Sequence, residues 1–465
     1  MYSWLVPRLV FPVYERLTGR RLWTTVQELR ELQWRSPGEL AARAAGRLRA
    51  LLVHAQRHVP YYRELFGAAG VDPGAIRGLQ DLARLPATTK AALRARLPDD
   101  IVADDRPARR RFTATTSGST GFPFEIRGDP ASADETLASY LFFLEWAGAA
   151  LWQTRIDLGV RLGRSYHAAP WVVSRAGRPF RRLVLGEDVR AMLGPDLTAV
   201  EFCAVVSRIP VRRGYFVRAY PAYAAELGAR LLAADVELPA APSVVISCSE
   251  TLTAARAAVM ARAFRTRVVN HYSSWEAMHV AQTCPDNPAV LHVNSERVVF
   301  WVARADGTPA EPGEPGRLLL TVLSNYVQPF VNYDIGDWGA TAGACPCGRG
   351  WPTLVALEGR TSEVIRTPSG RVLSAILLNQ LPSVGGRAAE IWEYQAEQTA
   401  SDQVVLRVVP APSFTSSTAD ALRAELQACL GGDVTLRVEV VDRIPSEPSG
   451  KRPVIVSSAR SLVDA

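Results

Sequence analysis

A chain of 465 residues exceeds the usual size of one compact core, so the length predicts at least two domains. Hydrophobic residues make up 48% of the chain and charged residues 21%, which is typical of a folded globular protein and excludes large-scale disorder. The net charge of +7 comes almost entirely from arginine, because only Lys90 and Lys451 are lysines. The short arginine runs lack regularly spaced aromatics, so we interpret them as solvated surface and expect no nucleic-acid partner.

The sequence also bears on the cellular compartment. No apolar stretch reaches the roughly 18 residues that a membrane span requires, and the best one, from Tyr140 to Trp152, is interrupted by Glu145. The amino terminus lacks the basic start, apolar run and cleavage site of a signal peptide. We therefore expect a cytoplasmic protein without a membrane span, as a monomer or a homodimer.

The amino-terminal third is predicted to be helical. Residues 36–58 carry apolar side chains at helical spacing, and Ser36 with Glu39 forms a capping-box pattern at the start. Pro60 ends this helix, because proline disfavours helical backbone in the residue before it. The segment from Leu85 to Lys90 opens another helix.

A stretch rich in hydroxyls and glycine follows, from Thr115 to Pro123. Glycines allow backbone N–H groups to approach an anion closely, and hydroxyl groups add further donors for phosphate oxygens. The stretch is not a Walker loop, because the Gly-Lys-Ser/Thr ending is absent. A flexible Ser/Gly linker is the alternative interpretation.

From about residue 155 to 335 the pattern alternates between strands and helices, which predicts an α/β domain of sheets covered by helices. The expected helix runs from Thr253 to Phe264, and residues 304–317 are expected to form a hairpin or loop. The expected strands lie at residues 244–246, 267–269, 298–300 and 318–322.

The composition changes near Gly359-Arg360. Beyond this point we expect strands at 404–409 and 434–440 and a helix from Thr418 to Leu430, which predicts a separate small α+β domain. The sequence therefore predicts a large domain over 1–360 and a small one over 361–465.

Six cysteines in a chain of this length do not suggest a disulfide framework, and their grouping suggests a metal. Cys284, His292, Cys345 and Cys347 supply four nitrogen and sulfur ligands, the number that a closed structural zinc site takes. Unrelated buried cysteines are the alternative. Cys203, Cys248 and Cys429 are expected to be small core residues.

Several motifs, in the same order along the chain, resemble the adenylate-forming superfamily of acyl-CoA synthetases, peptide-synthetase adenylation domains and luciferases. They are Thr116 to Pro123 for the phosphate loop, Ser249-Glu250, Asn270 to Glu276, Tyr333 to Asp337, Gly359 to Glu363, and Ile444 to Lys451. Phe122 stands where many members have lysine, Ser273 and Trp275 replace a glycine and a threonine, and Ser362 replaces the hinge aspartate.

The resemblance implies a nucleotide site. In it Thr116, Ser117, Gly118, Ser119, Thr120 and Gly121 hold the phosphates, and Ser249, Glu250 and Ser273 line the nucleotide. Asn270 and Tyr272 contact the adenine, Asp337 binds the ribose, and Arg360 contacts the ribose or phosphate. Glu276 helps to hold Mg²⁺, and Lys451 reaches the junction of carboxylate and α-phosphate. The implied catalytic residues are Lys451, Glu276 and Thr116, although a solvated surface turn is the alternative for Lys451.

The segment from His54 to Tyr62, the Leu85–Lys90 segment and the length resemble the phenylacetate–CoA ligase branch, in particular its CapK-type members, which carry such a zinc site. The implied function is ATP-dependent activation of a small carboxylic acid as acyl-AMP, followed by transfer to CoA or another thiol. The alternatives are an AMP-forming amide ligase with an amine acceptor and a biosynthetic accessory protein with impaired catalysis. Aromatic residues hint at an aryl acid, although such residues are more often core: Tyr140, Phe142, Phe143, Trp146, Tyr166, His167, Tyr215, Phe216, Tyr220 and Tyr223.

Overall fold

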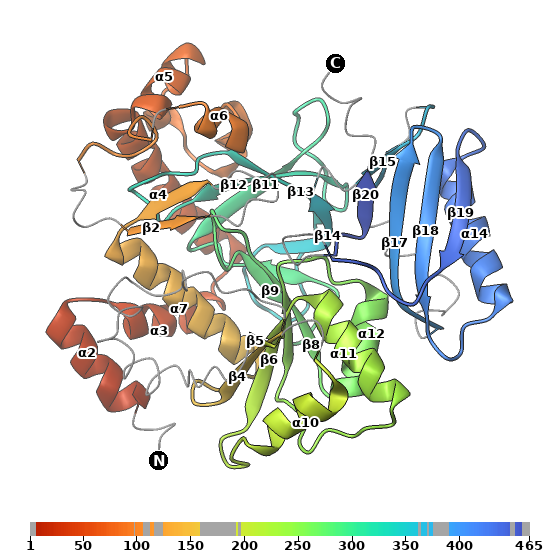
Figure 1. The fold of residues 1–465 in the computed structure, drawn as a ribbon. Coiled ribbons are helices and arrows are strands. Elements are labelled where there is room, and N and C mark those ends of the chain that lie inside the picture. The colour runs from red at the N-terminus through yellow and green to blue at the C-terminus, as the bar shows by residue number, and fades with distance from the viewer. Residues whose placement is uncertain are drawn as a thin grey trace. The chain divides into compact units, whose positions relative to one another are not determined.

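The computed structural model describes residues 6–96, 98–105, 112–115, 124–158, 192–193, 197–360, 364–369, 372–374, 390–446 and 452–457. The chain forms two compact units (Figure 1). The first comprises Met1–Gln153, Leu162–Asp188 and His271–Val355, and the second comprises Thr154–Arg161, Val189–Asn270 and Ala356–Ala465. Within the described ranges, no helix is long and apolar enough to cross a lipid bilayer.

The first unit begins with helices. In chain order they are η1 (Val6–Val10), α2 (Phe11–Thr18), α3 (Leu22–Leu32), α4 (Pro37–His58), α5 (Pro60–Ala68), η2 (Pro73–Ala75), η3 (Leu79–Arg84), α6 (Lys90–Arg94) and α7 (Pro130–Ala147). The predicted capping box is confirmed: the Ser36 hydroxyl accepts from the Glu39 N–H, and the Glu39 carboxylate accepts from the Ser36 N–H at 3.0 Å. The predicted break is confirmed as well, because Val59 separates α4 from α5.

The strands of the first unit are β1 (Thr88–Thr89), β2 (Phe112–Thr115), β3 (Glu125–Gly128), β9 (Ala281–Thr283), β10 (Leu291–Val293), β11 (Val298–Ala303), β12 (Gly316–Val322) and β13 (Tyr333–Thr341). The sheet order is β11-β12-β13-β14-β10-β9. Only the first residues of β14 (Thr353–Arg360), up to Val355, belong to this unit. Its main pairings are antiparallel, but β1 joins β13 in parallel, with Thr88 opposite Tyr333.

The aromatic run on α7 belongs to the core of the first unit. Phe142, Phe143 and Trp146 pack with Trp351 and with leucines of α3 and α4 in one buried cluster. The Trp146 indole N–H is satisfied by the side-chain oxygen of Gln33 at 3.1 Å, as a buried donor requires. These three aromatics therefore stabilise the fold, in agreement with the core interpretation.

The second unit combines parallel strands with helices. Its elements are β4 (Thr154–Leu158), β5 (Met192–Leu193), α10 (Ala199–Ser207), β6 (Tyr215–Ala219), α11 (Pro221–Ala233), β7 (Val245–Cys248), α12 (Ala254–Phe264) and the start of β8 (Val268–Tyr272). The strands β7, β6, β4 and β5 are neighbours in that order. Side chains of these helices and strands share one apolar core, which includes Phe202, Met260 and Phe264.

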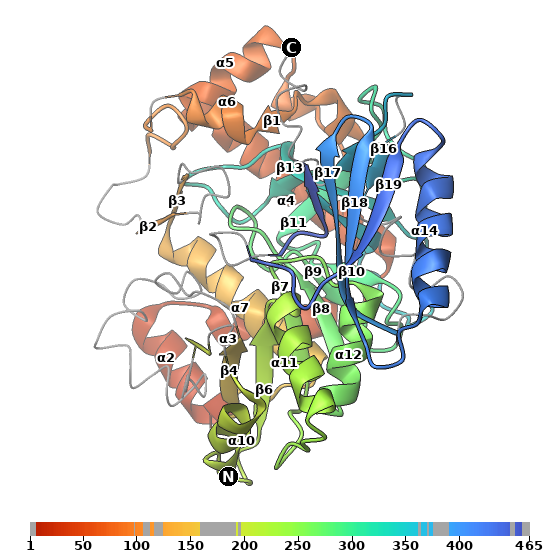
Figure 2. The ribbon, with the colours of Figure 1, turned by 45° about the vertical axis from the view of Figure 1, so that its right-hand side comes forward.

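The same unit contains a four-stranded sheet in the order β19-β18-β17-β20, with α14 beside it (Figure 2). The sheet strands and the helix are β17 (Ile391–Ala400), β18 (Gln403–Pro410), α14 (Ser416–Leu430), β19 (Thr435–Val440) and β20 (Ile455–Ser457), and β15 (Val364–Arg366) pairs with β16 (Val372–Ser374) in a separate two-stranded sheet. Leu422, Leu426 and Leu430 of α14 pack on the sheet. The predicted fold class, α/β with flanking helices and a small carboxy-terminal α+β part, is confirmed, whereas the domain boundary at 360 stays a prediction.

Candidate active site

Two residues predicted to bind the nucleoside lie together in the first unit. The Tyr272 hydroxyl donates a 2.7 Å hydrogen bond to the Asp337 carboxylate, although 65 positions separate them. Tyr272 ends β8 and Asp337 lies within β13, so each side chain is held by a strand. Both side chains are partly exposed, which leaves them accessible to a ligand.

A second group of polar side chains surrounds Glu276. Its Oε1 atom accepts a hydrogen bond from the Tyr333 hydroxyl at 3.1 Å and lies 3.3 Å from the Lys90 ammonium. Burial raises the pKa of Tyr333, and the neighbouring Glu276 charge raises it further, so the phenol stays protonated and donates. The Glu276 side chain is only 8% exposed, so the Lys90 ammonium and the Tyr333 hydroxyl replace water as partners of its carboxylate.

Lys90 reaches Glu276 because of a short parallel pairing. Thr89 lies opposite Asp334 in the β1–β13 register, and its hydroxyl caps α6 by accepting from the Ala92 N–H. Lys90 is the next residue, so it enters the site beside Tyr333. Lys90 was predicted only as part of the Leu85–Lys90 segment, and its contact with Glu276 was not predicted; its rarity as one of two lysines was the available signal.

Two histidines near Tyr272 in the sequence, His271 and His279, are buried. The His271 Nδ1 atom contacts the Gln282 side-chain oxygen at 2.9 Å, and its Nε2 atom contacts His279 Nδ1 at 2.8 Å. The Gln282 amide donates to the Phe143 carbonyl at 2.7 Å, so its oxygen is the acceptor for His271. His271 therefore carries its proton on Nδ1, and His279 donates to it from Nδ1. This series of hydrogen bonds holds the backbone next to Tyr272, and it was not predicted.

Other predicted nucleotide residues belong to the second unit. Ser249 adopts a left-handed φ of 70° directly after β7, a backbone conformation that favours glycine. The Glu250 carboxylate accepts from the Ala222 N–H at 3.3 Å and the Arg452 N–H at 2.9 Å. Asn270 is half-buried in β8.

The remaining residues of the predicted site divide into one that the structure describes and several that lie outside the described residues. Ser273 is half-buried, one residue after Tyr272. The phosphate loop from Thr116 to Gly121, together with Phe122, Ser362 and Lys451, lies outside the described residues, as do Tyr166 and His167. Arg360 ends β14, but its side chain is outside the described part. The roles of these residues stay predictions.

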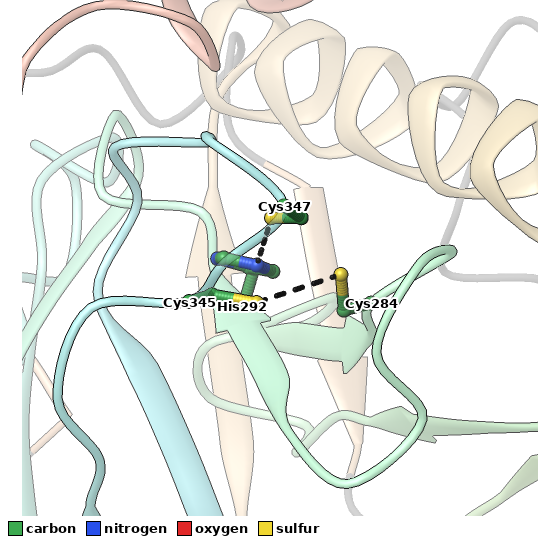
Figure 3. Close-up of side chains that lie close together, drawn as sticks. All are labelled: Cys284, His292, Cys345 and Cys347. Carbon is green, nitrogen blue, oxygen red and sulfur yellow. Dashed lines mark hydrogen bonds between the residues drawn. The ribbon is translucent and has the colours of Figure 1, made fainter.

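The four predicted metal ligands gather at one place in the first unit (Figure 3). Cys284 follows β9, His292 lies on β10, and Cys345 and Cys347 lie between β13 and β14. Their ligand atoms all lie within 4.8 Å of one another. All six cysteines are free thiols, so no disulfide competes for these sulfurs.

The distances in this cluster suit a tetrahedral ion. The sulfurs of Cys284 and Cys345 are 3.9 Å apart, and the sulfur of Cys347 is 3.3 Å from His292 Nε2. Zinc bonds of about 2.3 Å to sulfur and about 2.0 Å to nitrogen place such ligand pairs about 3.5–3.8 Å apart. The His292 Nδ1 atom lies 3.0 Å from the Trp351 carbonyl, which fixes Nε2 as the ligand atom. These residues could hold zinc.

Burial changes the protonation of the cluster in two ways. It lowers the pKa of His292, which keeps the imidazole in the neutral form that a metal binds. It raises the pKa of the Cys284 thiol to about 11, and a bound cation would offset this effect by stabilising the thiolate. The Arg349 N–H donates to the Cys347 sulfur at 3.5 Å, and the Arg349 guanidinium pairs with Asp286 and donates to Gln33 at 2.9 Å. The loop that bears Cys345 and Cys347 is thereby joined to the end of α3.

Comparisons with known proteins agree with this fold. Residues 367–458 match the CapK C-terminal domain family. The chain is 27% identical over 341 residues to a phenylacetate-coenzyme A ligase of Thermus thermophilus, covering 72% of this chain and 73% of that protein. It is 27% identical over 329 residues to the phenylacetate-coenzyme A ligase of Escherichia coli, covering 67% and 70%.

A solved structure of 2-hydroxyisobutyryl-CoA ligase in complex with 2-HIB-AMP superposes with a TM-score of 0.70 at 19% identity, covering 90% of this chain and 89% of that one. The shared fold and the curated relatives place the chain in the adenylate-forming (ANL) superfamily. Within it the chain is phenylacetate–CoA ligase-like and carries a CapK C-terminal domain, as the motif resemblance predicted.

Proposed function

We propose that this protein uses ATP to convert a small carboxylic acid into an acyl-adenylate and then transfers the acyl group to CoA or another thiol. The observation that carries the proposal is the Tyr272–Asp337 hydrogen bond, with Glu276 four residues after Tyr272. It brings a phenol ring and a carboxylate from two separate motifs within 2.7 Å in one unit. The curated relatives, which are phenylacetate-coenzyme A ligases, support the same chemistry.

The nucleoside would be recognised by Tyr272 and Asp337. The tyrosine ring offers a flat apolar face for adenine, and a carboxylate can accept hydrogen bonds from both ribose hydroxyls. The existing 2.7 Å bond between them holds both side chains in place before ATP binds, which reduces the entropy cost of binding.

The phosphates would lie beside Glu276 and Lys90. Mg²⁺, a hard cation with a preference for oxygen, would be held by the Glu276 carboxylate and neutralise phosphate charge. The Lys90 ammonium, 3.3 Å from Glu276, is close enough to contact the same phosphates. The hydroxyl-rich loop from Thr116 to Gly121 would hold the pyrophosphate portion.

In the proposed reaction a carboxylate oxygen of the acid attacks the α-phosphorus of ATP. A new phosphorus–oxygen bond forms, the bond from the α-phosphorus to the bridging oxygen breaks, and that oxygen leaves with pyrophosphate. Lys451 would offset the charge at the junction of the two reactants. Positioning of two bound reactants contributes on the order of 7–11 kcal/mol, which matches a site that forms no covalent bond to the protein.

The cysteine–histidine cluster would hold a structural zinc ion. All four ligands come from the protein, so no coordination position is available for a substrate. The ion would cross-link the β9–β10 hairpin to the loop before β14, and it would act on the site only through the stability of these segments.

The acceptor is the point on which rival functions differ. The curated relatives are phenylacetate-coenzyme A ligases, and a solved structure of similar fold is also a CoA ligase, which favours a thiol acceptor. An amide ligase would form the same intermediate and pass the acyl group to an amine. A biosynthetic accessory protein would bind nucleotide without forming the adenylate.

Acid-dependent exchange of labelled pyrophosphate into ATP, measured with a panel of aliphatic, aryl and arylacetic acids, tests the first step. Acid-dependent exchange supports adenylation and identifies the class of acid. AMP release with CoA or with amines then identifies the acceptor. Lys451→Ala should suppress exchange while ATP binding is largely retained, and a protein without exchange for any acid contradicts the proposal.

A further inference from the structure

The second unit contains a buried group of charged residues, of which only Glu250 has a predicted role at the nucleotide. Its cations are Arg256 of α12 and Arg452, whose side chains are 2% and 5% exposed. Its anions are Glu226 of α11, Glu250 after β7 and Glu393 of β17. The group therefore joins helices from the middle of the sequence to the carboxy-terminal sheet.

Arg452 makes the largest number of these contacts. Its guanidinium lies 2.5 Å from Glu226 and 3.3 Å from Glu393, and its Nε donates to the Ser446 hydroxyl at 2.9 Å. The guanidinium also lies 5.4 Å from the centre of the Tyr223 ring, within range of a cation–π interaction. The side chain thus contacts α11, β17 and the segment that precedes its own.

The main chain of Arg452 is held as firmly as its side chain. Its N–H donates to the Glu250 carboxylate at 2.9 Å, and its carbonyl accepts from the Arg256 guanidinium at 3.3 Å. Arg256 in turn pairs with Glu393 at 2.6 Å. The position of the Arg452 backbone is therefore fixed from both sides by the same buried charges.

Buried charges make this arrangement selective. A guanidinium removed from water is stable only when carboxylates and hydrogen bonds replace the lost hydration. Arg452 has these partners only where α11, the turn after β7 and β17 meet, so small displacements of its segment are penalised. The Arg452 guanidinium has five N–H donors in one plane and contacts Glu226, Glu393 and Ser446 together, whereas a lysine ammonium has three donors on a single nitrogen.

We infer that Arg452 is a positioning residue that sets the neighbouring Lys451 for the adenylation step. This inference rests on the proposed function. Arg452 directly follows Lys451 in the sequence, so contacts that hold the Arg452 backbone bear on the reach of the Lys451 amine. Glu250, which accepts the Arg452 N–H, is itself predicted to line the nucleotide, so the anchor is attached to the nucleotide-binding turn.

The anchor also has a consequence for the transfer step. The thiol step does not need an amine at the junction of carboxylate and α-phosphate, so the Arg452 contacts to Glu226 and Glu250 serve the first step alone. Weakening these contacts should therefore slow acyl-adenylate formation without slowing the attack of the thiol. A residue that only stabilised the fold would affect both steps alike.

The test compares both half-reactions in the full-length protein. Arg452→Lys keeps the charge and removes the fork, and Glu226→Gln removes one carboxylate from the anchor. We expect each variant to release pyrophosphate at least tenfold more slowly with the best acid of the panel, with the dissociation constant for ATP unchanged. Thioester formation from CoA and the synthetic adenylate of the same acid should stay within twofold of the wild type.

Arg230→Gln is the matched control. Arg230 contacts the other oxygen of Glu226 at 2.5 Å from a side chain that is 38% exposed, and it has no hydrogen bond to the described tail residues 452–457. Its pyrophosphate release should match the wild type. The double variant Arg452→Lys/Glu226→Gln should lose little more than either single variant, because both remove the same contact.

The outcomes separate the two proposals. If the wild type exchanges no pyrophosphate with any acid, the proposed function is wrong, and the role of Arg452 falls with it. If the wild type is active but adenylation is unchanged in both variants, or both half-reactions fall equally, only the role of Arg452 is overturned. Should Arg452→Lys not fold, Glu226→Gln decides, because Glu226 is the more exposed partner.

Discussion

The Tyr272 hydroxyl and the Asp337 carboxylate are joined by a 2.7 Å hydrogen bond across 65 positions of the chain. One residue comes from the motif assigned to adenine and the other from the motif assigned to ribose. Because adenine and ribose are covalently linked, the side chains that recognise them must lie close together. The bond provides this proximity.

Replacing Asp337 by Asn should weaken ATP binding by at least tenfold, about 1.4 kcal/mol or more, because the amide has one uncharged acceptor oxygen where the carboxylate has two charged ones. Tyr272→Phe should have a smaller effect, since the ring that stacks on adenine is kept. Equilibrium binding of ATP measures both. Asp306→Asn, on an exposed loop of the same unit, is the control, and equal affinity for ATP in Asp337→Asn would contradict the assignment.

Replacing Lys90 by Ala should slow pyrophosphate exchange by about 10–100-fold, because the variant loses a cation 3.3 Å from Glu276. Lys90→Arg should recover only part of the rate, because the guanidinium is larger than the ammonium. Arg94→Ala, one turn further along α6, provides a comparison of helix stability without a change beside Glu276. Exchange at the wild-type rate in Lys90→Ala would remove this residue from the site.

Native mass spectrometry should find one zinc ion per molecule. Cys347→Ser should lose it and lower the midpoint of thermal unfolding by about 5 °C or more, because the β9–β10 hairpin loses its cross-link. Cys429→Ser, a half-buried cysteine outside the cluster, should retain zinc. Stoichiometric zinc in Cys347→Ser would show that this sulfur is not a ligand.

Ser249 should tolerate glycine but not a β-branched residue. Its φ of 70° lies in the left-handed region, which costs about 1–2 kcal/mol for residues with a Cβ and more for branched ones. We therefore expect Ser249→Val to lower the free energy of unfolding by about 1–2 kcal/mol, measured by denaturant titration. Ser249→Gly should change it by less than about 1 kcal/mol, and an unchanged stability in Ser249→Val would show that the turn relaxes.

Much of the fold follows from local pattern. The Ser36–Glu39 capping box and the helix that Thr253 begins were predictable, because capping and periodicity involve residues within a few positions of one another. β17 was not predicted, because buried Glu393, Gln395 and Gln398 interrupt its apolar pattern. Their partners come from distant segments, which a local pattern does not reveal.

The candidate site, too, was predictable only in part. The four cysteine and histidine ligands were predictable, because few residue types bind zinc and this chain has few of them. The Lys90–Glu276 pair was not, because it depends on a two-residue strand that pairs with Tyr333 and Asp334, far along the chain, a pairing that short windows of sequence cannot reveal.

That short pairing decides how far the protein can be shortened. β1 adds to β13 beside Tyr333 and Asp334, so a truncation that starts after residue 90 deletes a cation of the site and leaves backbone donors and acceptors of a central strand uncovered. An uncovered strand edge is a template for association with other chains. Expression of a shorter fragment would therefore yield a protein that is both inactive and prone to aggregate, and biochemical work should begin with the amino-terminal helices in place.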